Sequence, residues 1–80
     1  MTKSDKQALS QFIHGRLVDH YYGGAKLSDI ITDVIVVCWP NKRPDDPINT
    51  ILEAIKLDDR MQTIKFLTSN SGPNYFIYIP

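Results

Sequence analysis

The sequence predicts an α+β domain in which three helices precede a C-terminal β-hairpin. Apolar residues recur at helical spacing in three segments between residues 9 and 55, and from residue 62 the spacing changes to two. The chain has 80 residues, a length that accommodates one hydrophobic core and therefore one domain over residues 1–80. Its 42% of hydrophobic residues are enough for a folded chain.

The first helix is expected over residues 5–21. Ser4, followed three residues later by Gln7, has the form of a capping box that satisfies free backbone N–H groups. A stripe of apolar residues then follows at helical spacing: Leu9, Phe12, Ile13, Leu17 and Tyr21. Gly23 supplies the stop, while Gly15 inside the helix predicts close packing against another backbone.

A short strand and a second helix are expected next. Residues 25–27 are long enough only for a strand stub, and Ser28 with Asp29 is typical of a helix N-terminus. The helix is expected to end at Trp39 before Pro40, because proline disfavours a helical conformation in the residue that precedes it.

A strand is the alternative to this second helix. The apolar positions have helical spacing, but residues 30–37 are mostly β-branched, a type that favours strands. We expect the helix, because the polar residues Asp29, Thr32 and Asp33 share one helical face. The alternative fold is a small α/β sandwich with a strand at residues 33–39.

Asp46 followed by Pro47 predicts the start of a third helix. An aspartate at the N-cap accepts a backbone N–H, and proline is well suited to the first helical position. The apolar residues that follow lie on one face: Ile48, Ile51, Leu52 and Ile55. The helix is expected to end near Leu57.

The C-terminal segment predicts a β-hairpin. Residues 63–68 and 75–79 are strand-like, and residues 69–74 between them are rich in turn-forming types. The side chains expected to face the helices are Ile64, Phe66, Tyr75, Ile77 and Ile79. Leu67, Phe76 and Tyr78 remain for the outer face, which is either open or covered by the first helix.

The order of these elements resembles that of the winged-helix fold group. The resemblance rests on residues 23–28 leading into the second helix, residues 46–57 in the place of the recognition helix, and residues 64–78 in the place of the wing. In winged-helix proteins that bind DNA, the third helix enters the major groove and the wing contacts the backbone or the minor groove. The resemblance therefore implies a small DNA-binding or transcription-regulating protein.

Five residues are the expected contacts to double-stranded DNA. On the third helix, Asn49 is suited to read adenine and Thr50 to contact a phosphate or a thymine methyl group. Lys56 on the same helix, with Lys42 and Arg43 in the preceding loop, would bind phosphates.

The charges of the chain oppose strong DNA binding. Nine Lys and Arg balance nine Asp and Glu, so the excess of cations that neutralises phosphates is missing. Asp45, Asp46 and Glu53 lie on or beside the third helix, and residues 69–74 contain no Lys or Arg. We expect weak affinity and a shallow salt dependence unless the protein dimerises.

The second hypothesis is a protein-interaction module, such as an inhibitor or adaptor of a larger complex that a virus or mobile element encodes. Residues 66–80 carry no charged side chain, and exposed apolar patches mark protein contacts. The expected partner-binding residues are Leu67, Tyr75, Phe76 and Tyr78. A free edge at residues 75–79 would also pair with a second copy, giving a homodimer through the hairpin.

Neither an enzyme nor a metal or cofactor site is expected. His14 and His20 are six residues apart and do not share a helix face. Cys38 has the apolar neighbours Val37 and Trp39, which predicts a buried, unreactive thiol. The longest apolar run, residues 34–39, is far shorter than the ~20 residues that span a bilayer. A cytoplasmic protein without membrane contact is therefore expected.

Overall fold

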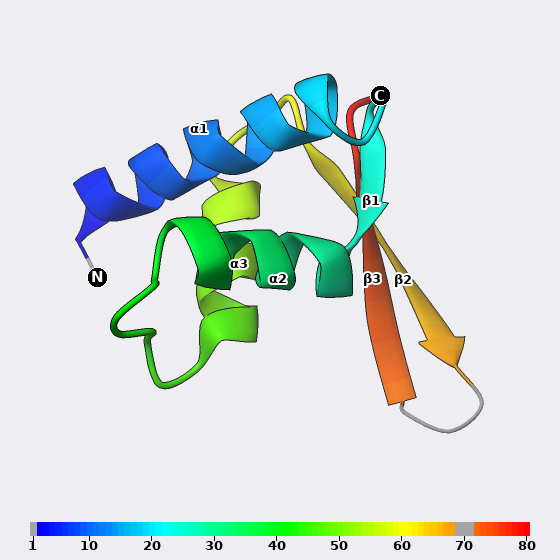
Figure 1. Ribbon diagram of the computed structural model, residues 1–80. Coiled ribbons are helices and arrows are strands. Elements are labelled where there is room, and N and C mark those ends of the chain that lie inside the picture. The colour runs from blue at the N-terminus through cyan, green and yellow to red at the C-terminus, as the bar shows by residue number, and fades with distance from the viewer. Residues whose placement is uncertain (1, 69–71) are drawn as a thin grey trace.

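Three helices and three strands follow one another in the predicted order (Figure 1). The structure is a computed structural model that describes residues 2–68 and 72–80, with side chains for residues 2–66 and 74–80. The elements are α1 (Lys3–Asp19), β1 (Gly24–Lys26), α2 (Leu27–Val37), α3 (Pro47–Lys56), β2 (Gln62–Thr68) and β3 (Gly72–Tyr78). The predicted α+β class, with three helices and a C-terminal hairpin, is confirmed.

α1 begins earlier than predicted, because Thr2 and not Ser4 is its N-cap. Thr2 Oγ1 accepts a hydrogen bond from the backbone N–H of Asp5 at 3.1 Å, and the Asp5 carboxylate accepts one from Thr2 at 3.3 Å. Gly23 turns the chain after the helix with a φ of 101°, as its position in the sequence predicts. The expected close packing at Gly15 is wrong, since a Cβ added there would meet nothing within 4 Å.

The segment that allows two interpretations is helical, so the alternative strand at residues 33–39 is wrong. Ile30 and Val34, one turn apart on α2, are buried in the core. Burying one such side chain contributes about 1.5–3 kcal/mol, more than the helix-propensity cost of a β-branched residue, which is at most about 0.7 kcal/mol. The helix starts at Leu27 with Lys26 as its N-cap, so the predicted Ser28 cap is also wrong.

α3 forms as predicted. The Asp46 carboxylate accepts a hydrogen bond from the backbone N–H of Asn49 at 3.1 Å, and Pro47 occupies the first helical position. Ile51 and Ile55 are buried on its inner face. The N-terminus of the helix is therefore fixed by its cap and its orientation by one apolar stripe.

The three strands form one antiparallel sheet in the order β1-β3-β2. β1 joins the hairpin by pairing with β3, where Ala25 lies opposite Ile77 and Lys26 opposite Phe76. In the hairpin, Ile64 lies opposite Phe76. Residues directly opposite one another in an antiparallel pair project from the same face of the sheet, so this register fixes which side chains face the helices.

The inner face of the sheet is only partly as predicted. Ile77 is buried, and Tyr75 and Ile79 pack against the core, as expected. On β2, however, Ile64 pairs with Phe76 and Phe66 with Asn74, which places both on the outer face. The expectation that Ile64 and Phe66 face the helices is therefore wrong.

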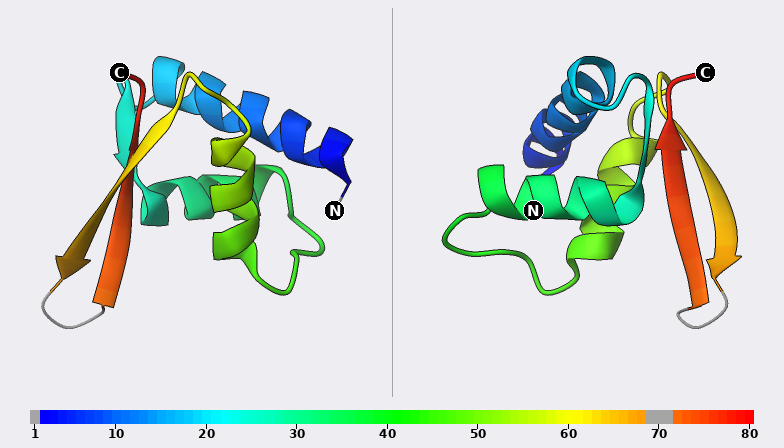
Figure 2. Two further views of the ribbon diagram at one scale, coloured as in Figure 1. Left: turned by 180° about the vertical axis from the view of Figure 1, so that it is seen from behind. Right: turned by 45° about the vertical axis from the view of Figure 1, so that its right-hand side comes forward.

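All three helices lie on one side of the sheet (Figures 1 and 2). Between the helices and the inner sheet face lies the hydrophobic core, formed by Leu9, Ile13, Leu17, Ala25, Leu27, Ile30, Val34, Ile51, Ala54, Ile55, Met61 and Ile77. The alternative in which the first helix covers the second face of the sheet is thus wrong, and no helix of the described chain covers that face.

Candidate functional site

Four large apolar side chains gather on the uncovered face of the sheet. Ile64 and Phe66 come from β2, and Phe76 and Tyr78 from β3. Ile64 is 52% exposed and Phe76 38% exposed, while Phe66 and Tyr78 are half-buried. We call these four residues the outer sheet patch.

The ring of Phe76 extends this patch over the neighbouring strand β1. A Cβ added to Gly24 would lie 2.8 Å from Phe76 Cζ and 2.9 Å from Cε1. The ring therefore rests on the backbone of Gly24, a close approach that only glycine allows. The phenylalanine covers backbone that would otherwise meet water.

The charged side chains of the sheet lie at its margins. Lys26 is exposed and pairs with Phe76, so it projects beside the outer sheet patch. Lys65 pairs with Tyr75 and belongs to the opposite, helix-facing side of β2. The predicted edge strand at residues 75–79 is wrong, because β3 is the central strand and the edges are β1 and β2.

The predicted partner-binding residues divide between the two faces. Phe76 and Tyr78 belong to the outer sheet patch, while Tyr75 packs against the core. Leu67 pairs with Pro73 in the hairpin, and its side chain lies outside the described residues. The predicted turn at residues 69–74 is too long, because residues 72–74 belong to β3; residues 69–71 lie outside the described residues. Sequence reasoning missed Ile64 and Phe66 as partner-binding residues, because the face to which each belongs is set by the pairing of β2 with β3.

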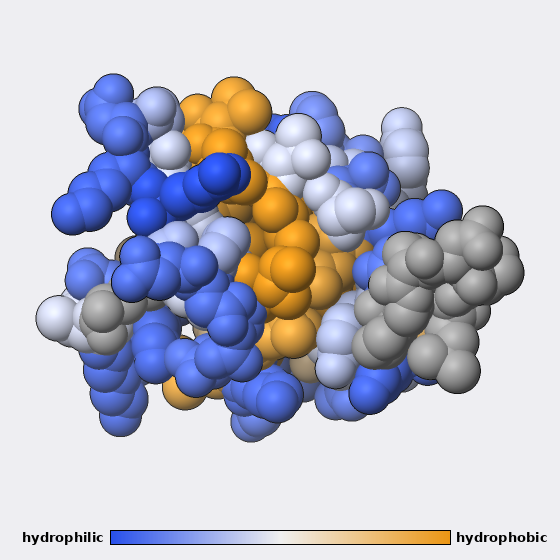
Figure 3. Space-filling model, turned by 90° about the horizontal axis from the view of Figure 1, so that it is seen from below, coloured by the Kyte–Doolittle hydropathy of each residue, from blue (hydrophilic) through white to orange (hydrophobic). Residues whose placement is uncertain are grey.

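A second apolar surface lies on the helices. Seen from below, hydrophobic residues form a band across the centre of the molecule between polar regions (Figure 3). The large apolar residues most exposed on α2 and α3 are Val36 at 67%, Val37 at 55% and Ile48 at 49%. Ile48 lies in the first turn of α3, the part of the helix where DNA contacts are expected.

The predicted base-reading residue Asn49 is held by an acidic neighbour. Its side-chain amide donates a hydrogen bond to Glu53 Oε1 at 3.2 Å, and Glu53 Oε2 forms an ion pair with Lys6 at 2.7 Å. Lys6 holds the pKa of Glu53 below its ordinary value, through a hydrogen bond and its charge. Glu53 is therefore ionised at neutral pH. Its negative charge lies one helical turn from Asn49, the residue expected to contact DNA.

The other predicted DNA contacts have varied surroundings. Thr50 is half-buried, and its hydroxyl donates a hydrogen bond to the backbone carbonyl of Asp46 at 2.8 Å. The hydroxyl proton is therefore already used within α3. Lys42, Arg43 and Lys56 are exposed, and none of them forms an ion pair within the described residues. Lys56 lies in the last turn of α3, at the opposite end from Asn49.

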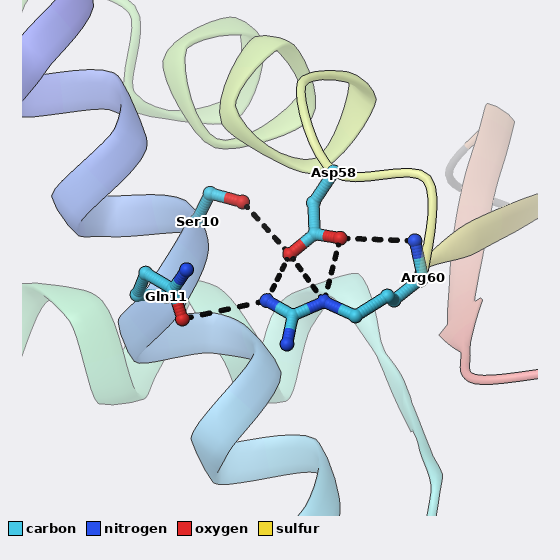
Figure 4. A network of polar contacts seen from close by, with 4 residues as sticks. All are labelled: Ser10, Gln11, Asp58 and Arg60. Atoms are coloured by element: carbon cyan, nitrogen blue, oxygen red, sulfur yellow. Dashed lines mark hydrogen bonds and ion pairs between the residues drawn. The ribbon is translucent and has the colours of Figure 1, made fainter.

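A polar network joins α1 to the turn before β2 (Figure 4). Arg60 donates to both carboxylate oxygens of Asp58, with the shortest contact at 2.6 Å, and also to Gln11 at 3.4 Å. Ser10, which is buried, donates to the same carboxylate at 3.5 Å. The hydrogen bonds from Arg60 lower the pKa of Asp58 to about 2. All four groups are satisfied by one another, which indicates a structural role.

Cys38 is exposed, so the prediction of a buried thiol is wrong. It lies at the rim of an apolar hollow of about 280 Å³, lined by Asp5, Ala8, Leu9, Cys38 and Trp39. Partial burial raises the pKa of the thiol above its ordinary value, which makes it a weaker nucleophile at neutral pH. Among the described residues, no three His, Cys, Asp or Glu side chains gather as metal ligands would.

No helix in the described part of the chain is long and apolar enough to cross a lipid bilayer. No known protein family, characterised protein or solved structure matches this chain.

Proposed function

We propose that the protein is a protein-interaction module that binds its partner through the outer sheet patch. The observation that carries the proposal is the gathering of Ile64, Phe66, Phe76 and Tyr78 on a sheet face that no described helix covers. Exposed apolar patches on small domains mark protein contacts, and aromatic residues are enriched in the centres of such contacts. An inhibitor or adaptor of a larger complex has this character.

The exposure of the patch is large enough to contribute to binding. Ile64 is 52% exposed and Phe76 38% exposed. Because full burial of such a side chain contributes about 1.5–3 kcal/mol, covering the exposed parts of these two residues supplies roughly 2 kcal/mol. The same exposure lowers the solubility of the free protein, a cost that a bound partner removes.

The test compares two substitutions at equally exposed positions. Ile64→Gln changes the outer sheet patch, and Val18→Gln changes α1; both residues are 52% exposed. We expect a specific protein to co-purify from source cells with the wild type and with Val18→Gln, and to be lost with Ile64→Gln. Circular dichroism and thermal unfolding establish that both variants fold.

The proposal would be contradicted if Ile64→Gln retained every partner as well as the wild type does. It would also be contradicted if no partner co-purified and the protein remained a monomer at high concentration. Loss of the partner with Val18→Gln alone would place the contact on α1 instead.

Binding of double-stranded DNA is the second candidate function. It follows from the proposed membership in the winged-helix group, which the order of α1, β1, α2, α3 and the hairpin supports. The observation that favours it is the exposure of Lys42, Arg43 and Lys56 without ion pairs in the described residues. Glu53 beside Asn49 and the exposed Ile48 oppose it, so we place it second.

A titration of mixed-sequence duplex DNA at low salt tests this candidate. Replacing Lys42 and Arg43 with alanine should weaken binding and reduce the slope of log K against log salt by about 2, since each lysine or arginine on a phosphate accounts for about one unit. Lys3→Ala, an exposed lysine on the first turn of α1, serves as the control. Undetectable binding of the wild-type protein at low salt would eliminate DNA binding.

A further inference from the structure

We infer that the partner of the outer sheet patch is an amphipathic α-helix whose flank carries carboxylates opposite Lys26. This inference rests on the proposed function and specifies the chemistry of the occupant. The shape of the face, the protection of its edges and the charge at its margin each restrict what fits there.

The dimensions of the face match one helix. Over the three residues of β1 the face is three strands wide, roughly 10 Å between the outer two, and beyond β1 it is the two-stranded hairpin. An α-helix with its side chains is about 10–12 Å across. β2 and β3 are seven residues long, which at about 3.3 Å per residue gives roughly 20 Å, or about four helical turns. A helix of about four turns would therefore be long enough to lie along the hairpin over the patch.

An added strand fits less well than a helix. β1 offers an edge of three residues only. On the longer edge strand β2, Lys65 is exposed, and a lysine on an edge strand is a common protection against edge pairing. The apolar surface of this sheet is thus available on its face and not along its edges.

The charge of the face distinguishes a foreign helix from a second copy of the chain. The described positions that project outward are Gly24, Lys26, Gln62, Ile64, Phe66, Asn74, Phe76 and Tyr78. Lys26 is the charged residue of this set, and the set contains no carboxylate. A second copy packed face to face would supply another Lys26 and no acid to pair with it. A helix with an apolar stripe and Asp or Glu along one flank would bury the outer sheet patch and form an ion pair with Lys26.

The experiment selects binders from a displayed library of 16-residue helical peptides with randomised surface positions, using the full-length protein as the target. We expect the enriched peptides to share apolar residues at i, i+3 or i+4, and i+7, with Asp or Glu on one flank. Individual peptides are then titrated against the variants by fluorescence anisotropy.

For these peptides, Ile64→Gln should raise Kd by about tenfold or more, as truncation of a central interface residue does. Val18→Gln, a change at an equally exposed residue on α1, should leave Kd unchanged. Lys26→Ala should raise Kd by about twofold to fivefold, the effect of one exposed ion pair, and should reduce its dependence on salt.

Four outcomes would overturn the inference. Enriched peptides with alternating apolar residues would indicate that the partner is a strand. If peptides flanked by Asp or Glu bind no better than the same peptides flanked by lysine, Lys26 does not select an acidic partner. Self-association of the protein that Ile64→Gln abolishes would make a second copy the occupant; in that case the inference fails while the proposed interaction through this face stands. If Ile64→Gln affects neither peptide binding nor self-association, both fail.

Discussion

At the scale of single residues, the ring of Phe76 occupies the space that a side chain at position 24 would need. An alanine at position 24 would place its Cβ 2.8 Å from Phe76 Cζ, so the ring must swing off the sheet. We expect Gly24→Ala to destabilise the protein by about 1 kcal/mol, because overpacking outweighs the gain from replacing a strand glycine. Urea denaturation measures the change.

Two comparisons control this prediction. In the Phe76→Ala background, the same Gly24→Ala change should be neutral or stabilising, since the obstructing ring is gone. Gly15→Ala on α1, where nothing lies within 4 Å of the added Cβ, should stabilise by up to about 1 kcal/mol through helix propensity. Additive effects of Gly24→Ala and Phe76→Ala would show that the two residues do not interact.

Asp58 makes the stability of the fold depend on acid pH. Arg60 lowers the pKa of this carboxyl from 3.8 to about 2, so the ionised form is favoured in the folded state. The stabilisation is fully present above pH 4 and is lost as the pH falls towards 2. Asp58→Asn should reduce stability at neutral pH by about 1–2 kcal/mol.

The measurement is the free energy of unfolding of wild type and Asp58→Asn between pH 2 and pH 5. Their difference should shrink as the pH falls, because the wild-type carboxyl becomes protonated. Asp59→Asn, at the exposed neighbouring residue, should follow the wild type throughout. A constant difference between wild type and Asp58→Asn would mean that the ion pair does not contribute.

At the scale of elements, Asp33 holds α1 against α2. Its carboxylate accepts a hydrogen bond from the Tyr21 hydroxyl at 2.5 Å and forms an ion pair with Arg16 at 3.3 Å. The hydrogen bond to Asp33 raises the pKa of Tyr21 from 10.0 to about 12. The protonated phenol is therefore favoured in the folded state. Its contribution to the stability of the fold is fully present below pH 10 and is lost as the pH rises towards 12.

Tyr21→Phe should lower stability at neutral pH by about 1–2 kcal/mol, the value of a hydrogen bond to a charged group. The difference from wild type should diminish between pH 10 and pH 12, measured by chemical denaturation. Tyr22→Phe is the matched control, because Tyr22 is 99% exposed. Equal stability of Tyr21→Phe and Tyr22→Phe at pH 7 would contradict the role of this contact.

At the scale of the whole molecule, balanced charge and an apolar face act together. The net formal charge is zero and the isoelectric point is near 6.7, so electrostatic repulsion between copies is weakest close to neutral pH. We expect solubility to be lowest near pH 6.7 and to rise when Ile64 is replaced by lysine, which adds charge and removes exposed apolar surface. Precipitation assays across pH 5 to 9 measure this, with Val18→Lys as the control for charge alone.

An equal gain in solubility from Val18→Lys and Ile64→Lys would show that net charge alone limits solubility. A larger gain in solubility from Ile64→Lys would indicate that copies of the protein associate through the outer sheet patch, because Val18 and Ile64 are equally exposed.

The sequence by itself determined the number, order and type of the main elements. Helical spacing on α2, the Asp46–Pro47 start of α3 and the two strands of the hairpin are local signals, each complete within about ten residues. The N-cap of α1 is also a local signal. The pairs Thr2–Asp5 and Ser4–Gln7 both have the spacing of a capping box, so the spacing alone does not show which pair caps the helix.

Only the tertiary structure decided which residues form the candidate site. The outer sheet patch depends on the register of β2 against β3, and a shift by one residue exchanges the two faces of a strand. In the register that forms, Ile64 lies opposite Phe76 and Phe66 opposite Asn74, which places both on the outer face. The path of the chain leaves all three helices on the other side of the sheet. Both facts arise from contacts between segments distant in sequence, and such contacts leave no local pattern.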